Sequence, residues 1–130
     1  MVENDIRRKV LIVDDEPNVR RLSRTILSKK FDVFEAENGI QAIEMAKVQK
    51  PDIILMDMMM PKMDGLTACQ AIRNDPETKS IPIIMVTAVG FELNMKLSQQ
   101  MGSNGYLTKP FSPHDLLAKI AQVLTDSSGS

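Results

Sequence analysis

The sequence predicts an α/β fold in which a parallel five-stranded sheet is covered by helices on both faces. The apolar runs 10–13, 53–56 and 81–86 have the length of strands, and their almost continuous apolar character is typical of strands buried on both faces. Segments of helical length, in which apolar residues recur every three or four positions, lie between them. Strands that alternate with helices in this way favour a doubly wound parallel sheet.

The first apolar run, 10–13, is followed by a predicted helix that begins near Pro17. Proline suits the first turn of a helix because its missing N–H would be unpaired there in any case. The apolar residues at helical spacing are expected to face the core, and they are Val19, Leu22, Ile26 and Leu27. The arginines among them are expected to face solvent, and they are Arg20, Arg21 and Arg24.

Residues 32–36 alternate polar and apolar side chains, which indicates an edge strand that is exposed on part of its surface. The turn residues Asn38 and Gly39 come next, and a second helix is expected to end before Pro51. The predicted buried face of this helix consists of Ile40, Ile43 and Ala46.

The second half of the chain continues the alternation of strands and helices. After the run 53–56 we expect a short helix over 66–73, the strand 81–86, a helix over 90–101 with a blurred apolar pattern, and a strand over 106–108. Five strands connected through helices fit the flavodoxin-like order 2-1-3-4-5, in which the first and third strands are neighbours at the centre of the sheet.

The last helix has a clear start signal at Ser112. Serine is a preferred N-cap, Pro113 occupies the first turn, and Asp115 is an acid three residues after the cap. The buried face predicted for this helix consists of Leu116, Leu117, Ile120, Val123 and Leu124.

Length and composition indicate one domain, expected over residues 8–125, with residues 126–130 as a flexible tail or a remnant of expression. The 130 residues include 16 lysines and arginines against 17 acids, so nothing in the overall charge favours direct binding to nucleic acid. Cys69 is the only cysteine, and no apolar stretch approaches the roughly 20 residues that a transmembrane helix needs. We therefore expect a cytoplasmic protein that does not insert into a membrane.

Reactive polar groups follow four of the predicted strands. Asp14 and Asp15 follow the first strand, and Asp57, Thr87 and Lys109 follow three others. Any one of them has an ordinary explanation, such as an acidic pair at the positive end of a helix. Because ligands bind beyond the carboxyl ends of parallel strands, their joint occurrence indicates that they converge on one site.

The chemistry of these groups favours a divalent metal beside a phosphorylated acid. Clustered carboxylates repel one another, and hard oxygen ligands in this arrangement suit Mg²⁺. An aspartate carboxylate can form an aspartyl phosphate, and Asp57, alone at the end of a fully apolar strand, is the candidate nucleophile. The metal, the Lys109 ammonium and the Thr87 hydroxyl would each hold one phosphoryl oxygen.

The sequence resembles the receiver domain of two-component response regulators, in the single-domain form known from chemotaxis. The resemblance extends over about residues 8–125 and rests on motifs that are specific in combination. These motifs are Val13-Asp14-Asp15-Glu16-Pro17, Met56-Asp57-Met58-Met59-Met60-Pro61 with Asp64-Gly65, Val86-Thr87-Ala88, and Lys109-Pro110-Phe111.

The resemblance implies that the phosphohistidine of a sensor histidine kinase or a histidine phosphotransfer protein phosphorylates Asp57. It implies that Asp15, Asp57 and the backbone carbonyl of Met59 hold Mg²⁺, for which Mn²⁺ can substitute, while Asp14 acts mainly through metal-bound water. In such domains the peptide bond between Lys109 and the following proline is usually cis, which is a minority state for X–Pro bonds.

The resemblance also implies a switch and an output face. Thr87 would move toward the phosphate and Tyr106 would turn inward behind it. The helix over 90–101, the strand over 106–108 and the last helix would together bind a downstream protein target or a second copy of the chain. Candidates for this face, chosen by position, are Phe91, Lys96, Tyr106, Lys119 and Gln122.

Two positions that vary among receivers are apolar in this chain. They are Met59, two residues after the acceptor, and Val89, two residues after Thr87. In relatives that hydrolyse the phosphate quickly, these positions are often polar and orient the attacking water. We therefore predict a comparatively long-lived aspartyl phosphate.

Three other functions share part of this pattern. A Mg²⁺-dependent phosphatase of the haloacid dehalogenase type also uses an aspartate nucleophile, but it needs a second Asp where this chain has Met59. A flavodoxin-type redox module needs a phosphate-binding loop at the position of Asp14 and Asp15, which would repel a phosphate. A receiver that only binds would lack Asp57 or Lys109. We therefore expect a phosphorylated switch rather than a turnover enzyme, either standing alone or as the receiver part of a longer transcriptional regulator.

Overall fold

The computed structural model describes residues 7–88 and 92–128, and its centre is one five-stranded sheet. The strand order is β2-β1-β3-β4-β5, and each pair of neighbouring strands is parallel. The predicted topology is therefore confirmed. The strands are β1 (Lys9–Val13), β2 (Asp32–Ala36), β3 (Ile53–Asp57), β4 (Ile83–Thr87) and β5 (Gly105–Thr108).

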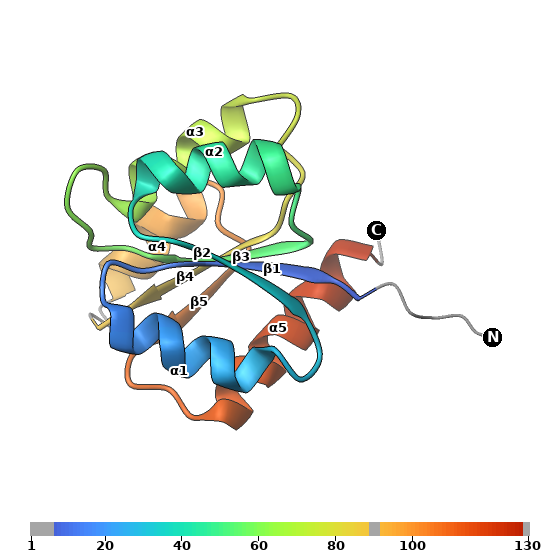
Figure 1. Ribbon diagram of the computed structural model, residues 1–130. Helices are drawn as coiled ribbons and strands as arrows, with labels where there is room; N and C mark the ends of the chain where they lie inside the picture. Colours follow the sequence, from blue (N-terminus) through green and yellow to red (C-terminus); the bar gives the residue numbers. More distant parts are fainter. Residues whose placement is uncertain (1–6, 89–91, 129–130) are drawn as a thin grey trace.

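Helices cover both faces of this sheet (Figure 1). Figure 1 shows α2 and α3 on one face and α1 and α5 on the other. The turn that follows α4 contacts α3, where the Cys69 thiol donates to the Met101 carbonyl oxygen at 3.4 Å. The helices are α1 (Pro17–Leu27), α2 (Gly39–Gln49), α3 (Gly65–Asn74), α4 (Glu92–Gln100) and α5 (Pro113–Ser128).

The side chains of the central strands alternate between two hydrophobic cores. On β1, Leu11 and Val13 belong to the core under α2 and α3, whereas Val10 and Ile12 belong to the core under α1 and α5. All residues of β3 and β4 are buried, which explains why both read as continuous apolar runs. Each large apolar side chain that is fully buried stabilises the fold by about 1.5–3 kcal/mol.

The predicted buried face of α1 is partly wrong. Leu22 is 54% exposed, whereas Ser23 is 2% exposed. Arg20 is also partly buried, because its side chain turns toward β2 and forms an ion pair with Glu35 there. Leu22 instead lines an apolar surface depression together with Phe111, beside Lys109. Of the four residues predicted to face the core, Leu27 is therefore buried, Val19 and Ile26 are partly buried, and Leu22 alone is exposed, while Ser23 takes the remaining buried position.

The predicted buried face of α2 is wrong at its first position. Ile40 is 52% exposed, whereas Gly39, Ala42 and Ala46 are buried. A Cβ atom on Gly39 would lie 2.9 Å from the Met63 carbonyl oxygen, so the residues at this surface must be small. The backbone of α2 lies close to the backbone at Met63, and this close approach determines which side of α2 faces the core.

Several boundaries differ from the expected ones by a few residues. Strand β4 begins at Ile83 instead of residue 81, because Pro82 has no N–H to donate to a neighbouring strand. Helix α5 continues to Ser128, past the domain boundary expected at residue 125. Its predicted start is confirmed: the Asp115 N–H donates to the Ser112 hydroxyl at 3.0 Å, and the Ser112 N–H donates to the Asp115 carboxylate at 3.4 Å.

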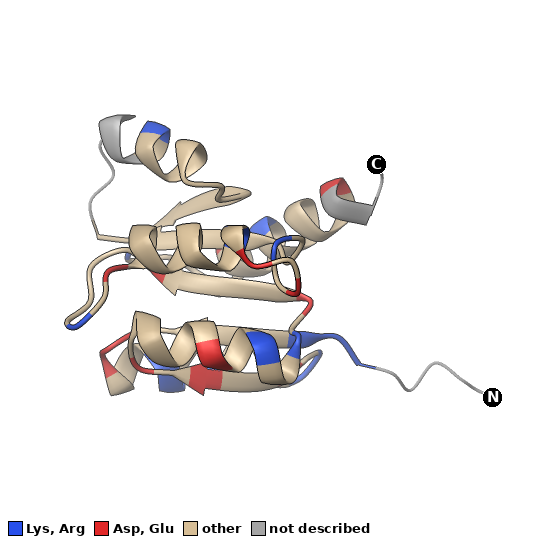
Figure 2. Cartoon of the chain, turned by 90° about the horizontal axis from the view of Figure 1, so that it is seen from above, with Lys and Arg blue, Asp and Glu red and all other residues tan. Residues whose placement is uncertain are grey.

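Charged residues of both signs are spread over the helices (Figure 2). Figure 2 also shows the basic segment of residues 7–9, which leads into β1 and includes its first residue, Lys9. Arg7 in this segment is bound locally: its guanidinium donates to the Ser28 and Phe31 carbonyl oxygens and pairs with Asp32 at 3.5 Å. In the described ranges, no helix combines the length and the apolar character that crossing a membrane would require.

Candidate functional site

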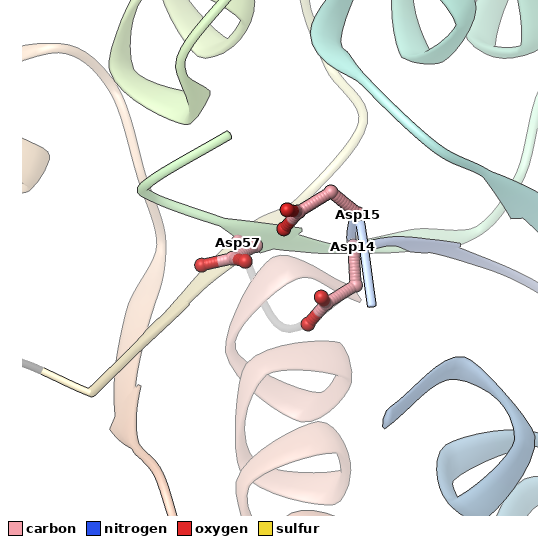
Figure 3. Close-up of side chains that lie close together, drawn as sticks. All are labelled: Asp14, Asp15 and Asp57. Carbon is pink, nitrogen blue, oxygen red and sulfur yellow. The ribbon is translucent and has the colours of Figure 1, made fainter. Parts of the chain in front are cut away.

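Three carboxylates from two strands converge at one edge of the sheet. Asp14 and Asp15 follow β1, and Asp57 is the last residue of β3. One oxygen atom from each carboxylate lies within 4.8 Å of the others, and Figure 3 shows the three side chains gathered beyond the strand ends. Asp14 is 3% exposed and Asp57 is 5% exposed, whereas Asp15 is open to solvent. The predicted convergence of these acids is confirmed.

The backbone around Asp14 is fixed by several hydrogen bonds. Its N–H donates to the Ala36 carbonyl oxygen on β2 at 3.1 Å. Its carboxylate accepts from the Glu16 N–H at 2.9 Å, which closes the turn between β1 and α1. Its carbonyl oxygen accepts from the Arg20 guanidinium at 2.6 Å. The acidic pair therefore lies on a loop with little freedom to move.

Asp57 is held by the turn that follows β3. Its carboxylate accepts from the Met59 N–H at 3.3 Å, and the N–H of Gly65 donates to the Met58 carbonyl oxygen at 2.9 Å. A Cβ atom on Gly65 would clash with the Asp57 carbonyl oxygen, so only glycine allows α3 to begin this close to the site. Pro61 is exposed in the loop between them.

Lys109 reaches this cluster from the end of β5. Its ammonium lies 2.8 Å from an Asp14 oxygen, 3.4 Å from an Asp57 oxygen and 3.5 Å from a Glu16 oxygen. The backbone N–H of Lys109 donates to the Thr87 carbonyl oxygen at 2.7 Å. The peptide bond between Lys109 and Pro110 is cis, as the resemblance implied. Glu16 was not predicted as a site residue, although its place directly after the acidic pair was a signal.

The electrostatics of the site leave negative charge uncompensated. Burial, and then the neighbouring Asp14 carboxylate, raise the pKa of Asp57 from 3.8 to about 6, against the opposing effect of Lys109. Burial alone would lower the pKa of Lys109, but Asp14 and Asp57 outweigh it and raise that pKa above its usual value. One lysine therefore faces three clustered carboxylates and Glu16. A set of hard oxygen donors with surplus negative charge fits a divalent cation.

Thr87 belongs to this site, whereas Tyr106 lies on a different surface. Thr87 is buried at the end of β4, and it borders an open depression of about 290 Å³ together with Asp57 and Lys109. Tyr106 on β5 is partly buried, packs against the core under α2 and α3, and lines a second depression of about 270 Å³ between α4 and α5. Burial raises the pKa of its phenol.

The two predicted hydrolysis-tuning positions are described only in part. Met59 is 67% exposed and lines the same depression as Asp57, so its side chain borders the space from which water would reach the Asp57 carboxylate. Val89 lies outside the described residues, and so does Phe91, one of the candidates for the output face.

Comparisons with known proteins agree with this geometry. The profile of the response regulator receiver domain matches residues 10–121. The chain is 41% identical over 119 residues to the chemotaxis protein CheY of Halobacterium salinarum, covering 91% of this chain and 98% of that protein. It is 41% identical over 121 residues to the transcriptional regulatory protein ResD of Bacillus subtilis, covering 92% of this chain and 49% of that protein.

Solved structures show the same likeness, and the relatives differ in length. The crystal structure of chemotaxis protein CheY4 from Vibrio cholerae matches with a TM-score of 0.87 and 31% identity, over 91% of this chain and 99% of that one. The chain spans about half the length of several curated relatives, including ResD, and nearly all of the Halobacterium CheY. With a receiver profile over most of its length and the fold to match, the chain belongs to the receiver domain family of two-component response regulators.

Proposed function

We propose that Asp57 is the phosphoacceptor of this receiver and takes its phosphoryl group from the phosphohistidine of a sensor histidine kinase or a histidine phosphotransfer protein. The observation that carries the proposal is the convergence of Asp57 with Asp14, Asp15 and Lys109 at the carboxyl edge of the sheet. Among these residues, Asp57 is the one that ends a fully buried strand, so the direction in which its carboxylate can attack a phosphoryl group is fixed.

In the proposed transfer, a carboxylate oxygen of Asp57 attacks the phosphorus atom. The new O–P bond forms as the P–N bond to the donor imidazole breaks, and the released imidazole nitrogen takes up a proton from solvent. Lys109 lies close enough to Asp57 to neutralise charge on a phosphoryl oxygen. The Met59 N–H and the Lys109 ammonium orient the carboxylate before the transfer.

The residues that would hold the cation are Asp15, Asp57 and the backbone carbonyl of Met59, with Asp14 acting through metal-bound water. Mg²⁺ is the proposed ion and Mn²⁺ a substitute, because the donors are hard oxygen atoms. When bound, the cation supplies positive charge to the carboxylates and to the phosphoryl oxygens. The raised pKa of Asp57 supports this assignment, because a nearby cation would favour the ionised nucleophile.

For the output we propose that Thr87 and Tyr106 transmit the state of Asp57 to the face formed by α4, β5 and α5. Thr87 shares a depression with Asp57, and Tyr106 follows on the neighbouring strand, where it pairs in register with Met85 of β4. This face would bind a downstream protein or a second copy of the chain, in the cytoplasm, where sensor kinases deliver phosphoryl groups.

Intact-mass spectrometry with acetyl phosphate and Mg²⁺ tests the acceptor. The wild type should gain the mass of one phosphoryl group, and Asp57→Asn should gain none. Asp64→Asn is a matched control, because Asp64 is an exposed acid that caps α3, and asparagine is an equally good cap. A phosphoryl adduct on Asp57→Asn, or none on Asp64→Asn, would contradict the assignment.

Slow loss of the phosphate separates a switch from a phosphatase. An exposed Met59 stands where the phosphatase class carries its second acidic residue. We therefore expect one labelling event followed by slow loss. Sustained release of phosphate from a small phosphoester such as p-nitrophenyl phosphate would favour the phosphatase instead.

A further inference from the structure

Arg20 faces the acidic loop and the edge strand, although its place in the sequence suggested a solvent-facing side chain. Its side chain is 15% exposed. The guanidinium donates to the Asp14 carbonyl oxygen at 2.6 Å through one nitrogen and to the Glu35 carboxylate at 3.1 Å through another. The planar guanidinium of arginine can donate two hydrogen bonds in different directions at once, and the single ammonium group of lysine cannot reproduce this geometry.

The bond to the Asp14 carbonyl has a specific structural consequence. That carbonyl belongs to the planar peptide group that joins Asp14 to Asp15. The N–H on the other side of Asp14 is held by the Ala36 carbonyl oxygen at 3.1 Å. With both sides of Asp14 anchored, the direction in which its side chain leaves the backbone is fixed, and the shared peptide group also fixes the position of the Asp15 Cα atom.

Glu35 supports this arrangement from the edge strand β2. Its carboxylate also pairs with Arg24 at 2.5 Å. Burial by itself would raise the pKa of Glu35, but Arg24 and Arg20 outweigh it and lower that pKa below its usual value, so the side chain is ionised at neutral pH. Its negative charge offsets that of the Arg20 guanidinium, which would otherwise repel a cation at the acidic cluster.

We propose that Arg20 is a positioning residue of the divalent-cation site and that it orients the peptide group between Asp14 and Asp15, with Glu35 as its support. This inference rests on the proposed function, since it requires that the acidic cluster binds a cation. Electrostatics alone predicts the opposite effect of removing Arg20, because loss of a nearby positive charge should tighten cation binding. The two explanations therefore differ in sign.

Isothermal titration calorimetry with Mg²⁺ on the unphosphorylated protein tests the proposal. Arg20→Gln should weaken Mg²⁺ binding about tenfold, the lower end of what loss of a residue that orients metal ligands costs. Arg24→Gln is the matched control: it also removes a contact with Glu35 and one positive charge, but Arg24 does not touch Asp14. Its Mg²⁺ affinity should stay within about twofold of the wild type.

Urea denaturation of the same variants separates positioning from general stability. Both variants should lose a similar small amount of stability, while only Arg20→Gln loses Mg²⁺ affinity. If Arg20→Gln does not fold, Arg20→Lys replaces it, and it should also bind Mg²⁺ more weakly than the wild type because it lacks the planar guanidinium. Unchanged or tighter binding by the folded variant would overturn the proposal. No binding of Mg²⁺ by the wild type would overturn the proposed metal site as well, so the two failures are distinguishable.

Discussion

The acidic edge of the sheet and the face formed by α4, β5 and α5 differ in how their residues are held. At the acidic edge, Asp14, Asp57 and Thr87 are at most 5% exposed, and backbone hydrogen bonds fix both acids. On the other face, Lys96 and Gln122 are exposed. Chemistry requires fixed atoms, which burial and strand ends provide, whereas recognition of a partner uses side chains that neighbours leave accessible.

The largest expected difference between the two regions concerns their glycines. Gly65→Ala should lower the free energy of unfolding by roughly 3–5 kcal/mol, because the new Cβ meets backbone atoms of Asp57 that cannot move aside. Gly105→Ala on β5 should cost about 1 kcal/mol, because its nearest contacts are side-chain atoms of Val123 and Ile84 at 3.1 and 3.5 Å. Urea denaturation measures both, and equal losses would contradict the contrast between a rigid edge and an adaptable face.

The burial of Asp57 should make the acidic edge a source of instability at neutral pH. With a pKa of about 6 in the folded state against 3.8 when unfolded, the folded protein binds more protons between these values, so stability falls as the pH rises through that window. This difference between the folded and unfolded pKa of Asp57 corresponds to about 3 kcal/mol of stability. Without Mg²⁺, Asp57→Asn should therefore be more stable than the wild type by up to this amount at pH 7.

The pH dependence gives the control for this prediction. The advantage of Asp57→Asn should shrink as the pH falls from 6 toward 4, where the wild-type side chain is protonated as well. Added Mg²⁺ should stabilise the wild type more than the variant. An advantage that is the same at pH 4 and pH 7 would show that the carboxylate charge is not its cause.

The α4–β5–α5 face is held firmly at the C-terminal end of α4, where Arg73 of α3 reaches it. The Arg73 guanidinium donates to the carbonyl oxygens of Gly102, Lys79 and Ile81 at 2.8, 3.1 and 2.6 Å, and to the Asn104 side chain at 2.5 Å. Arg73→Lys should lower the free energy of unfolding by about 2 kcal/mol, since an ammonium cannot reach all four acceptors. Arg21→Lys, at an exposed position on α1, should change it by less than about 0.5 kcal/mol.

Hydrogen exchange followed by mass spectrometry locates the Arg73 effect. Faster exchange in Arg73→Lys should be confined to the two segments that Arg73 joins, the amides of residues 79–83 and 98–105. If exchange rose equally around Asp14 and Asp57, the two regions would not be separable.

A smaller effect is expected from the apolar residues Met59 and Val89 at the two predicted hydrolysis-tuning positions. The double variant Met59→Asn with Val89→Glu should lose phosphate about tenfold faster than the wild type, because one added hydrogen bond to the attacking water contributes about 1.4 kcal/mol in the transition state. The decay of the phosphorylated mass after removal of acetyl phosphate measures the rate. Met59→Leu, which stays apolar, should decay at the wild-type rate, and an unchanged rate in the double variant would reject this account of a long-lived phosphate.

The sequence predicted the sheet and the acidic cluster well for one physical reason. A strand buried on both faces needs a continuous apolar run, and parallel strands bring their carboxyl ends to one edge, so the pattern of apolar runs was enough to place Asp14, Asp57 and Lys109 together. The exposed sides of the helices were less predictable. Leu22 and Ile40 are exposed because close packing around Ser23 and Ala42 sets the orientation of α1 and α2.

Arg20 shows the same limit at the site itself. An arginine between apolar residues of a helix has the pattern of a solvent-facing side chain, and only the position of Glu35 on the neighbouring strand reveals its bond to the acidic loop. Local periodicity contains no information about such a partner, which lies in another element. Contacts of this kind become visible only in the folded chain.

The smallest effect on stability is expected on the exposed surface of α5. Lys119 and Gln122 share one solvent-accessible hydrogen bond of 3.4 Å, so replacing both with alanine should change the free energy of unfolding by less than about 0.5 kcal/mol. Labelling by acetyl phosphate should be unchanged, because neither residue borders the depression around Asp57.

If α4, β5 and α5 form the output face, the variant with both Lys119 and Gln122 replaced should weaken phosphorylation-dependent self-association, measured by light scattering, or partner binding. Lys29→Ala, outside this face, should do neither. A variant that keeps its fold, its phosphate and its full association would move the output to another surface, because a residue that contributes only to recognition should lose only recognition when it is removed.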